Sequence, residues 1–294
     1  MPELPDVTVY VERLEALVVG QPLQELDVHN VFVLRSVSPA PADLAGRRVA
    51  EIRRMGKRIV IGFEGDVYAV IHLMIAGRLR WRAPGKKSPG KIALAAFIFP
   101  NGTLFLTEAG STRRASIFLV AGTRGLAEFG RGGLEPFDST AEQFAERLTS
   151  ENHTLKRALT DPRLFSGIGN AYSDEILHRA RLSPLLLTSK LDREQIQRLR
   201  DATLVTLREW TERLRAKVGD GFPEDVTAFH QEMAVHGRFG LPCPVCGSPV
   251  QRIRYATNET NYCARCQTDG RLLADRALSR LLKKDWPRSI DELD

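Results

Sequence analysis

The sequence lacks any long hydrophobic run, and no segment approaches the roughly 18 uninterrupted apolar residues that a membrane span requires. Its N-terminus also lacks the basic stretch followed by an apolar stretch that marks a secretory signal peptide. Internal repeats and low-complexity tracts are absent as well. These absences argue against membrane contact and predict a cytoplasmic protein, associated with the nucleoid if the source is bacterial.

Cysteine is scarce, with four residues in the whole chain, and all of them belong to two CxxC pairs. In a reducing compartment such pairs indicate metal binding rather than disulfides, although four free structural cysteines are the alternative. Four thiolates complete the tetrahedral shell of a structural zinc ion and leave no position for a reacting water. The sequence therefore predicts one structural Zn²⁺ held by Cys243, Cys246, Cys263 and Cys266.

The composition describes a globular chain with a moderate positive charge. Its 294 residues and 43% hydrophobic content favour two domains plus a small module. Lys and Arg total 42 against 36 Asp and Glu, which gives a net charge of +6 and a pI near 9.3. This balance is compatible with a polyanionic partner, but many basic proteins never bind nucleic acid.

The N-terminal half combines one helix with short strands. Apolar residues at spacings of three and four predict an amphipathic helix over residues 6–20. Strand-like runs follow at 58–61, 68–71, 79–81, 92–99 and 104–106, and Asn101-Gly102 between the last two is a strong hairpin signal. We expect an antiparallel β-sandwich preceded by the helix, in an α+β multidomain protein.

The C-terminal half has helical patterns and predicts the domain boundaries. Gly and Arg without periodicity place a linker at 122–136, between a domain at 1–121 and a helical domain at 137–240. Ser139-x-x-Glu142 and Asp192-x-x-Gln195 resemble capping boxes, the second opening a helix that reaches about Leu214. Further helices are expected at 155–159, 171–181 and 224–233. The zinc finger is expected at 241–270 and a helical extension at 271–294.

The chain starts with Met1-Pro2-Glu3, which is chemically suggestive if Met1 is removed. The exposed proline would carry a secondary amine of pKa near 8, so about a tenth of it is neutral at pH 7. Its attack on a sugar C1′ yields an iminium that accepts electrons during elimination, and Glu3 beside it can move protons. The plain alternative is an ordinary Met-Pro start without chemistry.

Five stretches together resemble the formamidopyrimidine-DNA glycosylase and endonuclease VIII family, over nearly the whole chain. They are the start Pro2 to Val7, Arg53 to Arg58, His72 to Gly77, the run Gly167 to Glu175 that is similar to the family's helix–two-turn–helix signature, and the cysteine quartet. Asp6 stands where the family has glutamate. The resemblance implies a helix–two-turn–helix DNA-binding domain followed by a zinc finger.

The resemblance also implies roles for individual residues. Pro2, Glu3 and Lys57 are the catalytic candidates, with Lys57 gripping a phosphate beside the lesion. Glycine-rich backbone at a helix start favours phosphate binding at Gly169 and Asn170, though such loops also merely connect helices. The remaining DNA-binding candidates are His72, Ile75, Arg113, Arg114, Lys156 and Asn258. Taken singly, these side chains are more often a core histidine, solvated cations or a surface turn.

Three departures from the family pattern concern DNA contact. Ile75 replaces a methionine at an intercalating position, and Ala115 replaces a phenylalanine after the arginine pair. Asn258 stands where the family's zinc finger has an arginine that contacts phosphates, and asparagine supplies no charge. Arg252 and Arg254 are the nearby candidates to compensate.

The sequence thus predicts a bifunctional DNA glycosylase and AP lyase of base-excision repair, acting on damaged, oxidised bases in double-stranded DNA. It would flip the nucleotide into a pocket between its domains, form a Schiff base through Pro2 and cleave by β,δ-elimination. The rivals are a noncatalytic damaged-DNA binder and an AP lyase with shifted lesion choice. Nothing demands more than a monomer. The tail, with leucines at 272, 273, 278, 281 and 282 and basic residues between, is expected to form an amphipathic helix on the finger or to contact DNA or protein.

Overall fold

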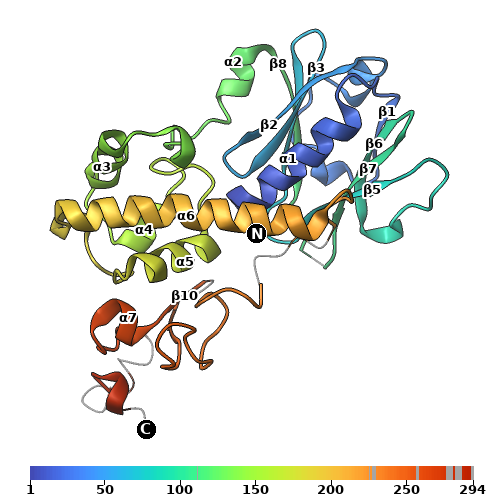
Figure 1. Cartoon of the computed structure of the whole chain (residues 1–294). Coiled ribbons are helices and arrows are strands. Elements are labelled where there is room, and N and C mark those ends of the chain that lie inside the picture. Colours follow the sequence, from blue (N-terminus) through green and yellow to red (C-terminus); the bar gives the residue numbers. More distant parts are fainter. Residues whose placement is uncertain are drawn as a thin grey trace. The chain divides into compact units, whose positions relative to one another are not determined.

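The computed structural model describes residues 1–110, 112–224, 226, 230–255, 258–275, 281 and 287–292 (Figure 1). The chain forms two compact units. Unit 1 comprises Met1–Arg131 and Trp210–Ala228, and unit 2 comprises Gly132–Glu209 and Phe229–Asp294. No helix among the described residues is long and apolar enough to cross a membrane.

Unit 1 is a β-sandwich with a helix, as the sequence predicted. Helix α1 spans Leu4–Val18. One antiparallel sheet has the order β1-β6-β7-β5 and the other the order β2-β3-β4-β8. The strands are β1 Glu25–Val28, β2 Val49–Met55, β3 Arg58–Phe63, β4 Val67–His72, β5 Gly77–Arg82, β6 Ala93–Phe99, β7 Gly102–Glu108 and β8 Ser116–Ala121.

The core of unit 1 is shared by α1 and the inner faces of both sheets. Leu79 and Phe97 come from one sheet, Ile59 and Ile61 from the other, and Tyr10 from α1. Strand β3 is buried on both faces, because its alternate side chains pack in a second cluster against helix α2 Gly122–Ala127. This double burial explains why β3 is apolar after Arg58 and was easy to predict.

Several elements of unit 1 differ from the prediction. The expected linker at 122–136 contains α2, whose Leu126 is fully buried in the second cluster, so the short helix is stabilised by packing that its sequence does not reveal. Strands β1, β2 and β8 were missed. Strand β2 carries charged residues on its exposed face, and β1 has only four residues, two of them acidic.

The chain returns to unit 1 at the end of the long helix α6 Arg193–Val218. Beyond it, Phe222 packs against Tyr10 with ring centroids 5.7 Å apart. The carboxylate of Glu224 accepts hydrogen bonds from Arg80 and Arg82 of β5, with Arg80 Nη1 at 3.1 Å. The described residues between 222 and 233 contain no helix, and the rest of the helix expected at 224–233 lies outside the described residues.

Unit 2 contains the helices α3 Ala141–Thr149, α4 Leu155–Thr160, α5 Asn170–Ala180 and the first part of α6. The Asp192–Gln195 capping box is confirmed by reciprocal bonds of 2.7 and 3.1 Å. The box predicted at Ser139 and Glu142 is wrong by one residue. Thr140 and Gln143 form it instead, because Thr140 is the residue with extended backbone before the first helical turn.

The rest of unit 2 is a cysteine-containing module with a C-terminal segment packed on it. The hairpin β9 Gln251–Arg254 and β10 Glu259–Tyr262 is followed by α7 Ala264–Thr268. Leu272, Leu273 and Ile290 of the C-terminal segment form a small core with Ile253 and Tyr262. The described part of the tail therefore packs on the finger, as predicted.

Other features of the tail are less completely described. Leu281 is 76% exposed. Leu278, Leu282 and the basic residues of the expected tail helix lie outside the described residues. The remaining short elements are the 3₁₀ turns η1 Val31–Val33, η2 Pro41–Leu44, η3 Gly90–Ile92, η4 Pro136–Asp138, η5 Thr188–Lys190 and η7 Ile290–Glu292.

Candidate active site and nucleic-acid interface

The N-terminus of unit 1 is buried in a charged environment. Pro2 is buried and Glu3 is only 2% exposed. Helix α1 begins at once, and the Glu3 N–H donates to Asp6 Oδ2 at 2.8 Å, which anchors the terminus. Burial lowers the pKa of the Met1 amine, Glu3 acts in the opposite direction, and Arg78 and Lys57 lower the pKa further.

These influences favour a nucleophilic amine. Low solvation and two nearby cations increase the neutral fraction, which is the form that attacks carbon. Removal of Met1 would make Pro2 the first residue, so that the free amine would be its secondary amine, next to Glu3 in the sequence. The structure therefore brings three predicted catalytic residues, Pro2, Glu3 and Lys57, into one electrostatic neighbourhood.

Asp6 is the most perturbed acid of this neighbourhood. Desolvation raises the pKa of this carboxyl from 3.8 to about 7, since it is 1% exposed. Its Oδ1 atom has no hydrogen-bond partner among the described residues. Asp6 also lines a pocket of unit 1. The other lining residues are Val9, Leu214, Lys217, Val218, Phe222, Pro223, Glu224 and Val226.

We expect Asp6→Asn to flatten the pH dependence of stability. The raised pKa means that the folded state holds a proton that the unfolded state releases, so this stabilising contribution is complete below about pH 4 and disappears as the pH rises to about 7. Asparagine keeps an oxygen for the Glu3 N–H but does not titrate. Urea unfolding across this range should show a weaker fall in the variant's free energy of unfolding. Asp220→Asn, at an exposed position of unit 1, serves as the control and should keep the parent's pH dependence. If Asp6→Asn also kept the parent's pH dependence of stability, the proposed titration of Asp6 would be contradicted.

Lys57 and His72 lie at one end of the sheet that contains β3. Lys57 occupies the two-residue turn between β2 and β3, where Gly56 adopts a φ of +62° that permits a tight turn. Burial, together with Arg58 and Lys57, lowers the pKa of His72 to about 4. The imidazole is therefore neutral at physiological pH and acts as a hydrogen-bonding group, not as a cation.

The predicted intercalating residues lie on two turns. Ile75 is 61% exposed in the turn between β4 and β5, where an apolar wedge is accessible. Arg113 is exposed and donates to the Lys91 carbonyl at 2.9 Å. Ala115 is buried, 3% exposed, and belongs to the core, so it adds nothing to an exposed wedge.

Sequence reasoning missed two residues that shape these turns. Glu108 is 2% exposed, and its Oε2 accepts the backbone N–H groups of Arg114 and Ala115 at 2.7 and 2.9 Å. Arg78 donates to the carbonyls of Gly77 and Ile75 at 2.7 and 3.2 Å and also acts on the N-terminal amine. Neither has a local sequence signal, because a strand arginine or glutamate normally faces solvent.

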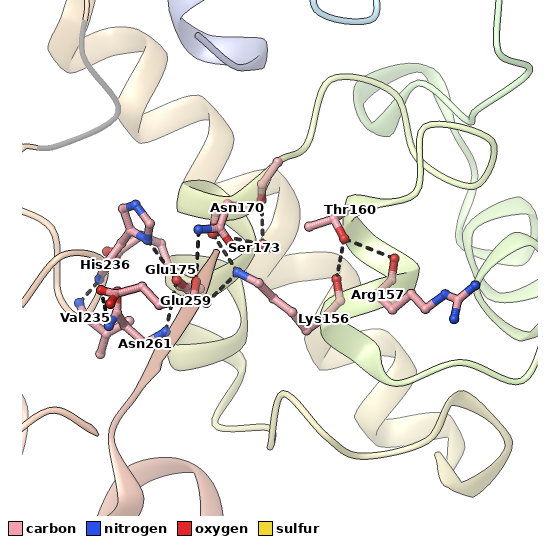
Figure 2. A network of polar contacts seen from close by, with 12 residues as sticks. Lys156, Arg157, Thr160, Asn170, Ser173, Glu175, Val235, His236, Glu259 and Asn261 are labelled. Atoms are coloured by element: carbon pink, nitrogen blue, oxygen red, sulfur yellow. Dashed lines mark hydrogen bonds and ion pairs between the residues drawn. The ribbon is translucent and has the colours of Figure 1, made fainter. Parts of the chain in front are cut away.

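In unit 2, a buried polar network joins α4, α5 and the hairpin (Figure 2). Lys156 Nζ donates to Asp174 Oδ1 and to the Asn170 carbonyl, both at 2.6 Å. Asp174 Oδ2 lies 2.8 Å from His236 Nδ1 and accepts the Asn261 N–H at 3.2 Å. Lys156 is thus buried and compensated, and it fixes the first residue of α5 in place.

The predicted phosphate loop enters α5 at Gly169 and Asn170. Gly167 has a φ of +76°, a conformation that favours glycine, whereas Gly169 is the extended N-cap of the helix. Asn170 Nδ2 donates to the Glu259 carbonyl of β10 at 3.0 Å. The helix start and the hairpin are therefore joined directly, as Figure 2 shows.

The four cysteines converge as predicted. Their Sγ atoms all lie within 4.8 Å of one another, which fits the separations of about 3.8 Å expected around a tetrahedral ion with Zn–S bonds near 2.3 Å. His178 of α5 lies 3.3 Å from Cys243 Sγ. The finger is a structural zinc site with a complete set of four thiolates, and α5 contacts it through His178.

Asn258 is exposed at the end of the hairpin, and its carbonyl accepts the Tyr255 N–H at 2.8 Å. The two candidate substitutes for its missing charge differ. Arg252 lies over the Phe239 ring and near Glu259, whereas the Arg254 side chain is exposed.

Comparisons with known families cover most of the chain. A model of the formamidopyrimidine-DNA glycosylase N-terminal domain matches residues 1–110. A model of the H2TH domain of the same enzyme matches residues 133–218. A model of the zinc finger found in FPG and IleRS matches residues 240–268.

Individual relatives agree. Formamidopyrimidine-DNA glycosylase of Thermus thermophilus is 34% identical over 284 residues, covering 92% of this chain and 100% of the relative. An uncharacterised formamidopyrimidine-DNA glycosylase-like protein of Mycobacterium tuberculosis is 40% identical over 151 residues, covering 51% of this chain and 94% of its own length.

Solved structures show the same similarity. The crystal structure of the MutM (Fpg) protein from Thermus thermophilus matches with a TM-score of 0.75 and 33% identity, covering 90% of this chain and 98% of the other. The Lactococcus lactis Fpg in complex with DNA containing an abasic site matches with a TM-score of 0.79 and 26% identity, covering 90% and 99%.

Proposed function

Because the chain belongs to the formamidopyrimidine-DNA glycosylase family, we propose that it is a base-excision repair enzyme with glycosylase and AP lyase activities on damaged double-stranded DNA. The observation that carries this proposal is the buried N-terminus, where Pro2 lies buried beside Glu3 and where burial, Arg78 and Lys57 lower the pKa of the terminal amine. A protein that only binds DNA has no use for a buried amine of lowered pKa beside an acid.

The proposed reaction begins with the neutral Pro2 amine attacking C1′ of the damaged nucleotide. The C1′–N bond to the base breaks and the base leaves with a proton. The Pro2 nitrogen loses its proton, the C1′–O4′ bond breaks as O4′ is protonated, and the opened sugar becomes an iminium joined to Pro2. Glu3 supplies and removes protons at the sugar, because it is the carboxyl group next to the amine. The iminium then accepts electrons as the C2′ proton leaves, and the 3′ phosphate departs by β-elimination. Loss of the C4′ proton lets the 5′ phosphate depart in turn by δ-elimination.

The pocket beside Asp6 is the proposed site for the extruded base in unit 1. Four residues of its wall are Phe222, Pro223, Glu224 and Val226, and Glu224 pairs with Arg80 and Arg82 of the sandwich. The preference for oxidised bases is part of the proposal and is supported by the similar structure of MutM in complex with carbocyclic 8-oxo-G containing DNA.

DNA backbone contacts are also proposed residue by residue. Lys57 is the phosphate cation of unit 1, His72 contributes a neutral donor, and Ile75 with Arg113 and Arg114 fills the space left by the base. In unit 2, Gly169 and Asn170 present the start of α5 to a phosphate, and Lys156 holds that start in place. The monomeric state and a cytoplasmic, nucleoid-associated location stay predictions.

Turnover on matched duplexes tests the proposal and its rivals. We expect base release followed by strand cleavage on duplexes carrying 8-oxoguanine, a formamidopyrimidine or an oxidised pyrimidine. Cleavage confined to an abasic site would favour an AP lyase with shifted lesion choice. Tight binding without release or cleavage on any duplex would favour the noncatalytic binder.

A further inference from the structure

The two arginines of strand β9 share one face of the finger hairpin. Side chains alternate along a strand, and Ile253 between them is 2% exposed in the finger core, so Arg252 and Arg254 project from the opposite face. The antiparallel register places Arg254 opposite Glu259 and Arg252 opposite Asn261.

Only one of these arginines is available to a partner. Arg252 lies over the ring of Phe239, with its guanidinium carbon 4.1 Å from the centroid, and its Nη1 is 3.7 Å from Glu259 Oε2. Arg254 is exposed, and no described residue pairs with its guanidinium group. Arg254 is therefore the uncommitted cation of this strand.

The backbone of Arg254 is fixed by the C-terminal segment. Asp275 is 2% exposed, and its Oδ2 accepts the Arg254 N–H at 2.6 Å. The same segment is tied to the hairpin by the Leu273 N–H, which donates to the Tyr262 hydroxyl at 2.7 Å, and by the packing of Leu272 and Ile290. The end of β9 is thereby held by residues that follow the last cysteine.

Arg254 also lies close to the start of α5. Paired residues in an antiparallel ladder have Cα atoms about 5 Å apart, so Arg254 is one strand away from Glu259. The Glu259 carbonyl accepts a hydrogen bond from Asn170 Nδ2 at 3.0 Å. A phosphate held at Gly169 and Asn170 would thus have this exposed cation on the neighbouring hairpin.

We propose that Arg254 is the phosphate-binding cation of the finger, taking over the charge that Asn258 lacks, and that Asp275 is a positioning residue that fixes it. The C-terminal segment then contributes to DNA binding through Asp275, which positions Arg254. This inference rests on the proposed function, since it assigns a contact to the DNA backbone. Its ligand is a phosphate of duplex DNA near the lesion.

Salt-dependent binding tests the contact. The zinc-loaded full chain, as Arg254→Gln, Arg252→Gln and Arg271→Gln variants, is titrated with a duplex carrying an uncleavable abasic analogue at several salt concentrations. The log of the association constant falls linearly with the log of the salt concentration, and each phosphate contact adds about 0.9 to the steepness of this fall. The loss of one contact should therefore make the slope for Arg254→Gln about 0.9 less steep than the parent's. The Arg252 variant on the same strand and the Arg271 variant on the C-terminal segment lose the same charge and should keep the parent's slope. Equal reductions in all three variants, or none for Arg254→Gln, would overturn the proposal.

A conservative pair of variants tests the positioning role. Asp275→Asn retains an oxygen to accept the Arg254 N–H, whereas Asp275→Ala does not. We expect parental affinity for the first and a several-fold loss for the second, with zinc content unchanged in both. Equal affinities for the two variants would remove Asp275 from the account.

The outcome is separable from that of the proposed function. Covalent trapping of the parent on an abasic duplex, measured in parallel, reports the lyase independently of Arg254. A trapped parent with an unchanged Arg254→Gln slope contradicts this inference alone. An untrapped parent whose Arg254→Gln slope falls contradicts the lyase and leaves the contact standing.

Discussion

Glu3→Gln is expected to lower the single-turnover rate of base excision by about 10²- to 10⁴-fold, the usual contribution of a positioned acid–base group. The change replaces a carboxylate by an amide of the same shape, so the residue that moves protons is lost without a cavity. Glu3 is buried beside the N-terminal amine, and its N–H bond to Asp6 uses the backbone and survives the substitution. Rapid-quench measurement with enzyme in excess would give the rate directly.

A binding measurement and a control variant show whether the lower rate comes from the chemical step. The variant should bind an uncleavable abasic analogue with parental affinity, because the amide adds no charge near a phosphate. Glu15→Gln, an exposed carboxylate on the same helix, is the matched control and should leave the rate unchanged. A Glu3→Gln rate within a few-fold of the parent would remove Glu3 from the proposed mechanism.

Loss of the zinc ion should have the second large effect, through DNA affinity. Cys263→Ser removes a buried thiolate of the four-sulfur site, and structural zinc sites of this size depend on the ion for their fold. The hairpin that carries Arg254 would lose its support, and so would the hydrogen bond from Asn170 to the Glu259 carbonyl of this hairpin. We expect affinity for lesion duplex to fall by on the order of 100-fold, toward the non-specific range of about 10⁻⁴ to 10⁻⁶ M.

Chelation provides the reversible control for this prediction. Removing zinc from the parent should reproduce the loss of affinity, and adding zinc back should restore it, whereas Cys263→Ser should not recover. Unit 1 should keep its fold throughout, because the cysteines lie in unit 2. Full affinity in zinc-free protein, verified by mass spectrometry, would contradict a role for the finger in DNA binding.

The features predicted from sequence are those with local causes. The cysteine quartet follows from spacing alone, and the Asp192–Gln195 cap and the hairpin after Phe99 follow from residue types at fixed offsets. The family resemblance made Lys57 and the start of α5 candidates for DNA binding. The periodicity of the sequence does not reveal either of them.

The features that sequence reasoning missed depend on distant parts of the chain. Asp6 is raised toward pKa 7 because tertiary packing desolvates it, and nothing in its neighbouring sequence encodes that. Arg78 lowers the pKa of the N-terminal amine although it is far away in sequence, and its guanidinium donates to the Ile75 carbonyl of the turn that precedes β5. The burial of Lys156 against Asp174 requires two helices to meet. From the sequence, this lysine is therefore interpreted as a phosphate contact or as a solvated cation. Likewise, the return of residues 210–228 to unit 1 is a property of packing.

The most direct test of the central claim is borohydride trapping of the purified chain on an abasic duplex, with Met1 removal verified and the adduct mapped by mass spectrometry. We expect a covalent adduct on the Pro2 nitrogen, strand ends carrying phosphates, and loss of the adduct in a variant that retains Met1. A chain that has lost Met1 and binds the duplex tightly, yet forms no adduct or forms one at a lysine, would contradict it.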